Sequence, residues 1–344
     1  MSGLEIWDAR DPADREGWER LHAGWEHREV FAHPAYVEMF AGPGERPLAA
    51  YAESTDGWIL YPFLLRRIEA EDRTDIATPY GYGGPYRDGE IATTGADAFW
   101  NDFGDWALDA GVVSEFVRLS LFADQLAPYP GERVRGGDNV VLELAPGPNE
   151  LWRDYEHKVR KNVKRARERG VEIVRDEHGE RLDDFLRIYR ATMDRRDARD
   201  AYYFDAALFE GIRDRLGGQF AFFHALSDGR VVSTELALVS ADNVYSFLGG
   251  TESGSFDLRP NDLLKHELIL WARAAGRRRF VLGGGYERDD GIFRYKRSFA
   301  PGGVVGFETG RRIFDAAAYE RLVAARGPAS AMEYFPAYRA PSPG

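Results

Sequence analysis

The residues best suited to chemistry lie in one stretch near the end of the chain, between Phe280 and Gly303. A short apolar run there, Phe280 to Leu282, predicts a buried strand that stops at three successive glycines, Gly283 to Gly285. Glycine has no Cβ, so another backbone or a ligand can come very close to the chain at Gly284.

A lysine follows these glycines in an apolar setting. Ile292, Tyr295, Lys296 and Phe299 recur at helical spacing, which places the ammonium of Lys296 on the same face as three apolar groups. Such a lysine either extends toward water or is kept for chemistry. A fixed ammonium beside the oxyanion that forms when an amine attacks an ester could lower the barrier by roughly 3–4 kcal/mol. The attacking amine must also lose a proton, and Glu287, Asp289 and Asp290 are nearby in sequence.

A second candidate is a strongly cationic helix that we expect over 150–169. Asn149 is a suitable N-cap and Gly170 stands where a C-terminal glycine belongs. A solvated face that complements the helix dipole is one interpretation, and a phosphate-bearing ligand is the other. The predicted buried stripe consists of Trp152, Tyr155, Val159, Val163 and Ala166, and the cations are Lys158, Arg160, Lys161, Lys164, Arg165, Arg167 and Arg169.

Arg199 and Tyr203 form a third candidate. They are four residues apart, so a helical turn would place a guanidinium beside a phenol on one face. A surface ion-pair cluster with Asp197 and Asp200 explains the same spacing.

Composition limits the partners. With 45 Lys and Arg against 57 Asp and Glu, the formal charge of −12 repels nucleic acid overall, so any contact with tRNA or DNA must be local. The absence of Cys excludes disulfides, thiolate nucleophiles and Cys-ligated metals, and it fits a reducing compartment. Neither a signal peptide nor a long apolar run is present, so we expect a cytoplasmic protein without a membrane span.

The predicted elements repeat. Each half reads as helices, an antiparallel meander with an Asp-Gly turn (Asp56-Gly57 and Asp228-Gly229), a long helix and a strand. Trp106-Ala-Leu-Asp-Ala-Gly111 and Trp271-Ala-Arg-Ala-Ala-Gly276 close the two long helices alike. A chance recurrence of a common helix end is the alternative, but the matched order favours duplication. This order predicts an α+β fold with helices on mostly antiparallel sheets.

Several familiar motifs are missing. There is no Gly-x-Ser-x-Gly and no His-Glu-x-x-His, so a nucleophile-elbow hydrolase lacks support and we expect no metal. The glycines at 81 and 83 fail the dinucleotide pattern because Tyr86 takes its last position. If the fold is of the acetyltransferase kind, coenzyme A would need free N–H groups before the second long helix, where Pro260 removes a donor and Asp257 and Asp262 add negative charge.

Four tracts of the second half form a recognisable combination. They are Leu151-Trp152 with the run from Lys158 to Ala166, the tract from Tyr189 to Tyr203, the glycine triplet, and above all Phe293-Arg-Tyr-Lys-Arg-Ser-Phe299. Together they resemble the FemABX-like aminoacyl-tRNA-dependent transferases. That family lies within the N-acyltransferase (GNAT) superfamily and is built from two such folds in tandem.

The resemblance implies an amino acid moved from its tRNA ester to an amine, often on a cell-wall precursor. It places Tyr295-Lys296 at the reaction centre and gives Arg199 and Tyr203 to an acceptor phosphate. The chain departs from the family after Tyr36, where an acceptor-site lysine is lacking, and at Arg118-Leu-Ser-Leu121, where relatives have Arg-x-Asp-Pro. These departures put the acceptor in doubt more than the reaction.

We therefore expect two tandem GNAT-like domains, 1–147 completed by about 305–344, and 148–304, in a monomer. The expected activity is aminoacyl-tRNA-dependent aminoacyl transfer to a cell-wall precursor or to a secondary-metabolite peptide or nucleoside, with aminoacyl-tRNA as co-substrate and no cofactor. An acyl-CoA-dependent N-acyltransferase and a non-catalytic phosphate-ligand module are the alternatives. The expected catalytic residues are Lys296, Tyr295, Asp289 and Asp290, and the expected substrate-binding residues are Arg199, Tyr203, Lys158, Arg160, Lys161, Lys164, Arg165, Phe299 and Gly284.

Overall fold

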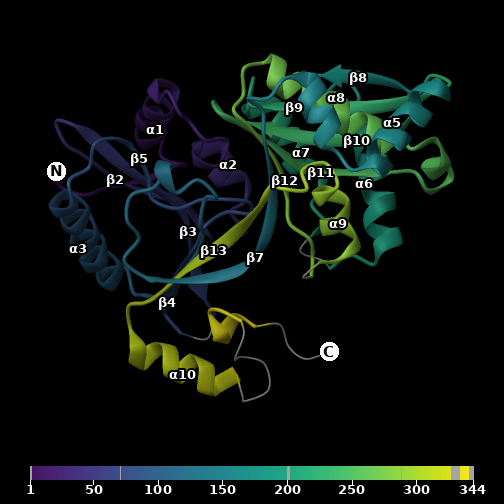
Figure 1. Ribbon diagram of the computed structural model, residues 1–344. Coiled ribbons are helices and arrows are strands. Elements are labelled where there is room, and N and C mark those ends of the chain that lie inside the picture. The colour runs from purple at the N-terminus through teal and green to yellow at the C-terminus, as the bar shows by residue number, and fades with distance from the viewer. Residues whose placement is uncertain (1, 70, 200–201, 288, 327–333, 341–344) are drawn as a thin grey trace. The chain divides into compact units, whose positions relative to one another are not determined.

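The computed structural model describes residues 2–69, 71–199, 202–287, 289–326 and 334–340 (Figure 1). The chain forms two compact units. Unit 1 contains Met1–His27, Phe31–Gly136 and Phe307–Gly344, and unit 2 contains Arg28–Val30 and Gly137–Gly306. The chain passes from unit 1 to unit 2 inside strand β7 (Glu132–Glu143) and returns inside strand β13 (Val304–Ile313). The passage inside β7 comes earlier than the domain boundary expected at residue 147.

Unit 1 is built on the strands β1-β2-β3-β4-β6-β13, in that order. Neighbours are antiparallel except β4 and β6, which run parallel, and β5 pairs with β3. The strands are β1 (Glu5–Asp8), β2 (Arg46–Glu53), β3 (Gly57–Ile68), β4 (Arg73–Ala77), β5 (Tyr86–Gly89) and β6 (Val112–Arg118). The helices are α1 (Pro12–Gly24), α2 (Pro34–Met39), α3 (Thr93–Asp109) and α10 (Ala316–Arg326), with 3-10 turns at Val30–Ala32, Ala123–Gln125 and Ala337–Arg339.

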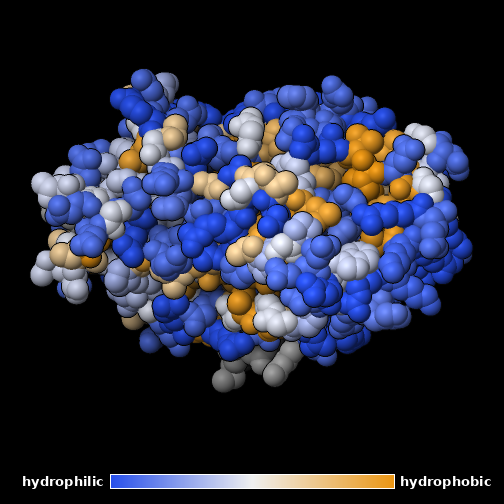
Figure 2. Space-filling view, turned by 45° about the horizontal axis from the view of Figure 1, so that its top comes forward, coloured by the Kyte–Doolittle hydropathy of each residue, from blue (hydrophilic) through white to orange (hydrophobic). Residues whose placement is uncertain are grey.

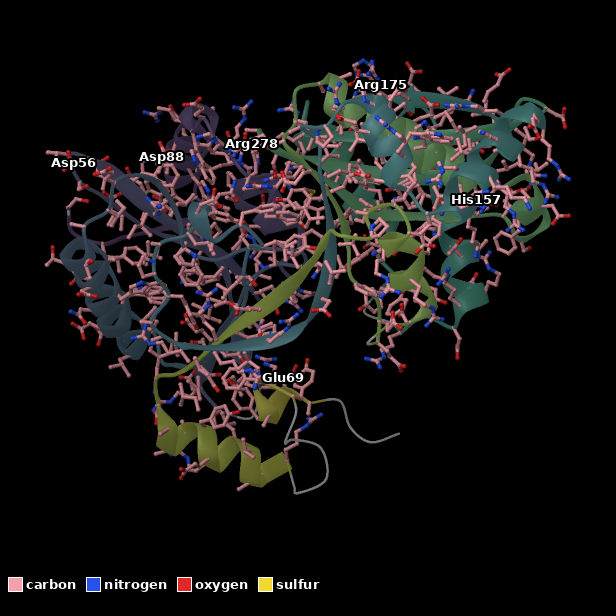
Figure 3. The ribbon with its side chains drawn as sticks, viewed as in Figure 1. Asp56, Glu69, Asp88, His157, Arg175 and Arg278 are labelled. Carbon is pink, nitrogen blue, oxygen red and sulfur yellow. The ribbon has the colours of Figure 1, made fainter. Side chains whose placement is uncertain are left out.

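Alternating side chains of unit 1 fill two cores. Phe99 and Phe103 of α3 pack on one face of the sheet with Tyr61, whereas Trp18 of α1 packs on the other face with Leu60. The bend between β2 and β3 contains Asp56, labelled in Figure 3, and the Asp56 carbonyl accepts from the Glu90 amide, just after β5, at 3.0 Å. These pairings give unit 1 a core of its own.

Unit 2 is built on the strands β7-β12-β11-β10-β9-β8, in that order. All neighbours are antiparallel except β11 and β12, which run parallel. The strands are β8 (Glu172–Asp176), β9 (Phe220–Ser227), β10 (Arg230–Val239), β11 (Asn243–Thr251) and β12 (Arg279–Gly283). The helices are α4 (Pro148–Asp154), α5 (His157–Glu168), α6 (Leu182–Arg196), α7 (Ala206–Arg215), α8 (Pro260–Ala274) and α9 (Gly291–Arg297), with a 3-10 turn at Ser253–Leu258.

Helices cover both faces of the unit 2 sheet. Leu264 and Leu268 of α8 share one core with Val159 and Val163 of α5. On the other face, Phe185 of α6 packs with Phe209 of α7 and Phe222 of β9, at ring separations of 4.9 and 5.0 Å.

The hairpin between β9 and β10 turns at Asp228-Gly229, both with positive φ (51° and 76°), as the Asp-Gly pair predicts.

The two units repeat one topology. In each, a short strand and two helices precede an antiparallel meander of three strands, and a long helix then leads to a strand parallel to the meander's last one. In each unit that strand is also bordered by an antiparallel strand, β13 in unit 1 and β7 in unit 2. The predicted α+β fold of tandem, mostly antiparallel domains is confirmed.

One predicted helix is wrong. The stretch expected as a single helix over 150–169 is two helices, α4 and α5, with non-helical backbone at Tyr155 and Glu156. The first begins after Gly147, so Asn149 lies inside it and is not the cap. The break is held from outside, because the Glu156 amide donates to the Ser298 carbonyl at 2.9 Å.

The visible surface is mostly hydrophilic, with hydrophobic side chains gathered in small patches (Figure 2). Across the part of the chain that the structure describes, no helix has the length and apolar character needed to cross a bilayer.

Candidate active site

The candidate site of unit 2 lies where two parallel strands stop pairing. Within the described residues, the pairing of β11 with β12 joins Asn243 to Arg279, Val244 to Phe280 and Tyr245 to Val281, and goes no further. Beyond Tyr245, β11 remains paired with β10. Just beyond these pairs, the Ser246 hydroxyl of β11 and the carbonyl of Gly284, the residue after β12, are each bonded to a lysine.

Lys296 is one of these lysines. Its Nζ donates to the Gly284 carbonyl at 2.7 Å from helix α9, and its side chain is half-buried. Burial, followed by the charge of Lys265, lowers the pKa of Lys296 to about 8 against the opposing effects of Glu235 and Asp290. The ammonium expected from the sequence therefore loses its proton around pH 8, below the range of an exposed lysine.

Lys265 is the other lysine, and sequence reasoning missed it. It lies on α8 with 4% of its surface exposed, and its Nζ donates to Glu235 Oε1 and, at 2.6 Å, to Ser246 Oγ. Burial lowers the pKa of Lys265, and Glu235 opposes that change. A signal existed, because Lys265 falls four residues before Ile269 on the buried face of the helix, where a cation needs a partner.

Close packing of the protein itself requires glycine at two of these positions, and the backbone conformation favours it at the third. A Cβ on Gly284 would lie 2.9 Å from the Asp138 carbonyl oxygen, and one on Gly285 would lie 2.4 Å from Asp290 Oδ1. Gly283 has a φ of +83°, in the left-handed region. Gly284, expected to bind substrate, presents its carbonyl to Lys296 in this structure.

The acidic loop after the glycines forms the N-terminal cap of α9. Asp290 is the N-cap, and its carboxylate accepts from the amides of Phe293 and Tyr286, both at 2.7 Å. Burial works against ionisation, but these backbone bonds lower the pKa of Asp290 below its ordinary value. Asp289 is exposed and lies 3.5 Å from Arg297 Nη1. A role for either as a general base stays a prediction.

Tyr295 and Phe299 tie α9 to its neighbours. The Tyr295 hydroxyl accepts from Asn261 Nδ2 at 2.8 Å, and burial raises the pKa of Tyr295 well above its ordinary value, so the phenol stays neutral. Phe299 is 0% exposed and stacks edge-on against Tyr155 and Tyr295. Because it has no free surface, Phe299 supports the site from the core and does not line it as the sequence suggested.

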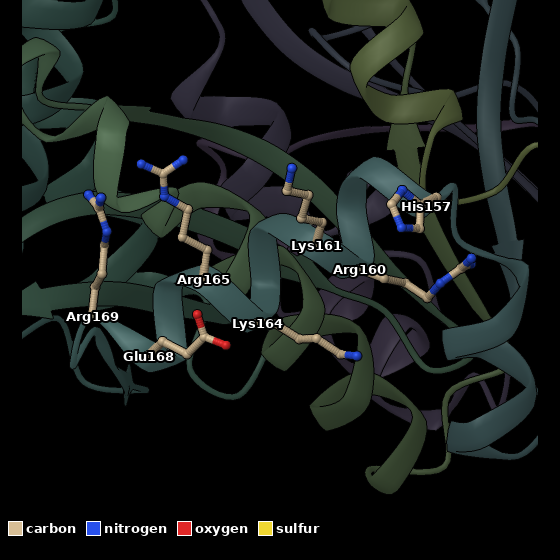
Figure 4. A pocket seen from close by; sticks show the side chains of 7 residues that line it. All are labelled: His157, Arg160, Lys161, Lys164, Arg165, Glu168 and Arg169. Atoms are coloured by element: carbon tan, nitrogen blue, oxygen red, sulfur yellow. The ribbon is translucent and has the colours of Figure 1, made fainter.

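The cations of α5 line a hollow on the surface of unit 2, shown in Figure 4 with Lys161, Arg165 and Arg169 extending to one side of the helix. Some are used inside the protein: Arg160 donates to the carbonyls of Arg153 and Tyr155, and Arg167 pairs with Glu267 at 2.7 Å. Among the described residues, the side chains of Lys161, Lys164 and Arg165 have no hydrogen-bond or ion-pair partner.

Helix α8 brings the cationic helix and α9 together. Asn162 of α5 donates to the buried carboxylate of Asp262 at 3.1 Å, and Asn261 beside it bonds to Tyr295. The charge of Lys158 also acts on Asp262, whose pKa is raised chiefly by burial. The first turn of α8 therefore contacts both α5, which carries the cations, and α9, which carries Lys296.

Arg199 and Tyr203 lie in the segment that follows α6. Tyr203 is 40% exposed, and its hydroxyl donates to Asp194 Oδ1 at 3.2 Å, while Arg199 is also exposed. The neighbouring Tyr202 stacks edge-on against Tyr286, just after the glycines, at 5.1 Å. The segment thus contacts the glycine loop, although Asp200 and Ala201, within the predicted motif, fall outside the described residues.

Two buried histidines of unit 2, His224 and His266, lie where the neutral ring is favoured. Burial lowers the pKa of His224 and of His266 to about 4. Over the described ranges, no three His, Asp or Glu side chains are grouped so as to hold a metal ion.

Comparison with known proteins bears on the fold and on the class of enzyme. Residues 153–297 match the family described as "Acetyltransferase (GNAT) domain". The structure is similar to the crystal structure of FemX, with a TM-score of 0.70 at 12% identity, covering 89% of this chain and 97% of that one.

It is also similar to the C-terminal domain of a putative lysylphosphatidylglycerol synthetase from Agrobacterium fabrum, with a TM-score of 0.57 at 14% identity and coverage of 90% and 94%. The structure of L-PGS from Bacillus licheniformis is similar with a TM-score of 0.56 at 12% identity, covering 90% of this chain and 94% of that one. No curated protein matches the sequence. At these identities the structural likeness establishes the fold, and the matched family supports an acyltransferase.

Proposed function

We propose that the chain is an aminoacyltransferase that moves an amino acid from aminoacyl-tRNA to an amine. The observation that carries the proposal is Lys296, half-buried where β11 and β12 separate and held on the Gly284 carbonyl at 2.7 Å. An acyltransferase needs a cation or a set of donors at the point where a carbonyl oxygen becomes negative. Lys296 meets that need in the unit that matches an acetyltransferase family.

The reaction requires little covalent chemistry from the protein. The amine nitrogen attacks the ester carbonyl, the new C–N bond forms, and negative charge collects on the carbonyl oxygen beside Lys296. The C–O bond to the ribose then breaks, the oxygen leaves as a hydroxyl, and it takes up the proton that the amine has lost. Asp289, Asp290, Glu287 and the ribose hydroxyl all stay candidates for carrying that proton.

Lys265 and Glu235 act on this step through Lys296. Their buried ion pair keeps a positive charge close to Lys296, and like charges disfavour a second ammonium nearby. Burial is the main reason that Lys296 gives up its proton more readily than an exposed lysine would; the charge of Lys265 adds to this effect, and Glu235 opposes it. A substrate oxyanion would reverse this balance by favouring the ammonium, so Lys296 stabilises the charged intermediate more than the neutral ester.

The unpaired cations of α5 support a phosphate-rich donor. Lys161, Lys164 and Arg165 project from one helix of a chain with a net charge of −12. In an acidic protein such a patch attracts nucleic acid locally, through phosphates. The resemblance of the lysine tract to FemABX-like transferases, the fold shared with FemX, and the lysyl product in the name of the Agrobacterium fabrum synthetase favour an aminoacyl donor.

An acyl-CoA donor is the second candidate, because the matched family is described as an acetyltransferase. The first turn of α8 argues against a pyrophosphate there. Its cap, Arg259, has a φ of 59°, Pro260 supplies no N–H, and Asp262 is a buried acid in that turn.

A donor competition tests the proposal. Purified protein is incubated with an amine pool and either a pool of labelled aminoacyl-tRNAs or labelled acetyl-CoA, and products are read by mass spectrometry. We expect amide products from aminoacyl-tRNA that ribonuclease treatment abolishes. Products from acetyl-CoA alone would overturn the choice of donor.

A further inference from the structure

We propose that Tyr286, supported by Tyr202, is a stacking platform for the base of the terminal nucleoside that carries the amino acid. The inference rests on the proposed function and names a part of the substrate that the site would hold. No step of the reaction described above uses these two rings.

The Tyr286 ring is exposed yet held. Half of the residue's surface, 50%, is open to solvent, and its ring lies 5.1 Å from that of Tyr202 at an interplanar angle of 86°. An edge-to-face contact fixes the orientation of an aromatic ring and leaves surface for a further ring. Every nucleobase has a π-face, so an exposed, oriented phenol suits stacking without regard to sequence.

Backbone bonds fix the position of both tyrosines. The Tyr286 amide donates to Asp290 Oδ2 at 2.7 Å, the same carboxylate that caps α9. The Tyr202 amide donates to the Arg199 carbonyl at 2.8 Å, and its carbonyl accepts from the buried Tyr189 hydroxyl. The platform is therefore tied both to the helix of Lys296 and to α6.

The distance to the reaction centre matches an aminoacyl nucleoside. Tyr286 follows Gly284, the partner of Lys296, by two residues, and such a step spans at most about 7 Å. In an aminoacyl-tRNA the reacting ester and the terminal base are attached to the same ribose. A base that stacks on Tyr286 would thus keep its ester close to the Lys296 ammonium.

The charge around the platform is favourable for a nucleotide. Arg196, at the end of α6, is close enough for its charge to act on the Tyr286 hydroxyl. Arginine next to an aromatic ring adds attraction for a stacked base and for the adjoining phosphate.

The test uses an acceptor-stem RNA minihelix whose terminal adenosine is replaced by 2-aminopurine riboside. Stacking quenches 2-aminopurine, so we expect quenching on binding to the wild type and to Tyr286→Phe, which keeps the ring. Tyr286→Leu should bind roughly 5- to 100-fold more weakly and leave the probe bright. Tyr334→Leu, a change at a tyrosine of unit 1 with 49% exposure, is the matched control and should behave as wild type.

The outcomes separate this inference from the proposed function. If Tyr286→Leu quenches and binds like the wild type while transfer from aminoacyl-tRNA proceeds, the platform is overturned and the activity stands. If the wild type neither binds the minihelix nor uses aminoacyl-tRNA, both fall. Circular dichroism of each variant confirms folding, which a loop substitution at a half-exposed ring should preserve.

Discussion

At the scale of single residues, the account depends on two lysines with different tasks. Lys265 is paired with Glu235 in the core of unit 2, whereas the one bond of Lys296 within the described residues is to a carbonyl, and part of its surface is open. A buried cation with a carboxylate partner stays charged, and a neighbouring lysine without one gives up its proton more easily.

The pH dependence of transfer should report Lys296. With its pKa at about 8, the ammonium is present below that value and lost as pH rises through it, so the rate should fall there. An exposed lysine would keep its charge to about pH 10.4. Lys296→Arg should move this falling limb beyond pH 9.5, because guanidinium stays protonated.

The measurement is kcat/KM from pH 6.5 to 9.5 for both proteins. If the amine acceptor must be neutral, kcat/KM also rises with pH as the amine loses its proton, and this rise should be the same for the wild type and for Lys296→Arg. A falling limb that stays near pH 8 in Lys296→Arg would assign it to another group.

The Lys265–Glu235 pair should behave as a buried ion pair in denaturation. Glu235→Gln alone leaves the Lys265 charge without its counter-ion, and we expect a loss of about 3–5 kcal/mol in the free energy of unfolding. The double change Glu235→Leu with Lys265→Met should recover much of that loss, since both charges are removed together. Urea titrations measure both, and equal losses in the single and double variants would contradict a coupled pair.

At the scale of elements, the sequence predicted most of the helices and strands because their apolar periods are regular. The break between α4 and α5 could not be predicted, since neither proline nor glycine marks it. It depends on contacts from distant residues, above all the Ser298 carbonyl that receives the Glu156 amide.

The candidate site was predicted where one stretch supplied it and missed where it did not. Lys296, Tyr295 and the glycines are close in sequence, so their pattern could be read directly. Glu235 and Lys265 lie on a strand and a helix that only the fold brings together. A lysine on a buried helix face was the available signal, but its partner could not be named from one sequence.

The cations of α5 should separate into structural and binding groups. Arg160→Ala removes donors from two carbonyls at the break, so it should lower the free energy of unfolding by about 1–3 kcal/mol. Lys161→Ala should leave stability within about 0.5 kcal/mol, because its side chain is exposed and has no partner in the described structure.

Salt titration of tRNA binding gives the complementary result. Replacing Lys161, Lys164 and Arg165 together by alanine should weaken binding and reduce the slope of log K against log salt by about 2 to 3, close to one for each lost phosphate contact. An unchanged slope would show that this helix is a solvated face and not a phosphate site.

At the scale of the whole molecule, one topology is used twice with different interiors. Unit 2 places lysines where its parallel strands separate. Unit 1 instead buries Glu115 of β6, which accepts from Tyr129 at 2.8 Å and from Tyr61 at 3.3 Å. Burial raises the pKa of Glu115 to about 7, while the tyrosine bonds and Arg312 oppose that change.

Glu115 should make the stability of unit 1 depend on pH. Its pKa is raised on folding, so the stability that it contributes is complete below about pH 4.5 and is lost as pH rises through about 7. Glu115→Gln should therefore stabilise the protein at pH 8, by at most about 3 kcal/mol, and have little effect at pH 5. Thermal unfolding at the two pH values measures this, and an equal effect at both would contradict it.

The central claim is that Lys296 stabilises the oxyanion of aminoacyl transfer, and single-turnover transfer from aminoacyl-tRNA to an amine tests it most directly. The account predicts a tRNA-dependent amide product whose rate falls by about 10²- to 10³-fold in Lys296→Ala, with tRNA affinity unchanged. A Lys296→Ala protein that transfers at the wild-type rate would contradict it.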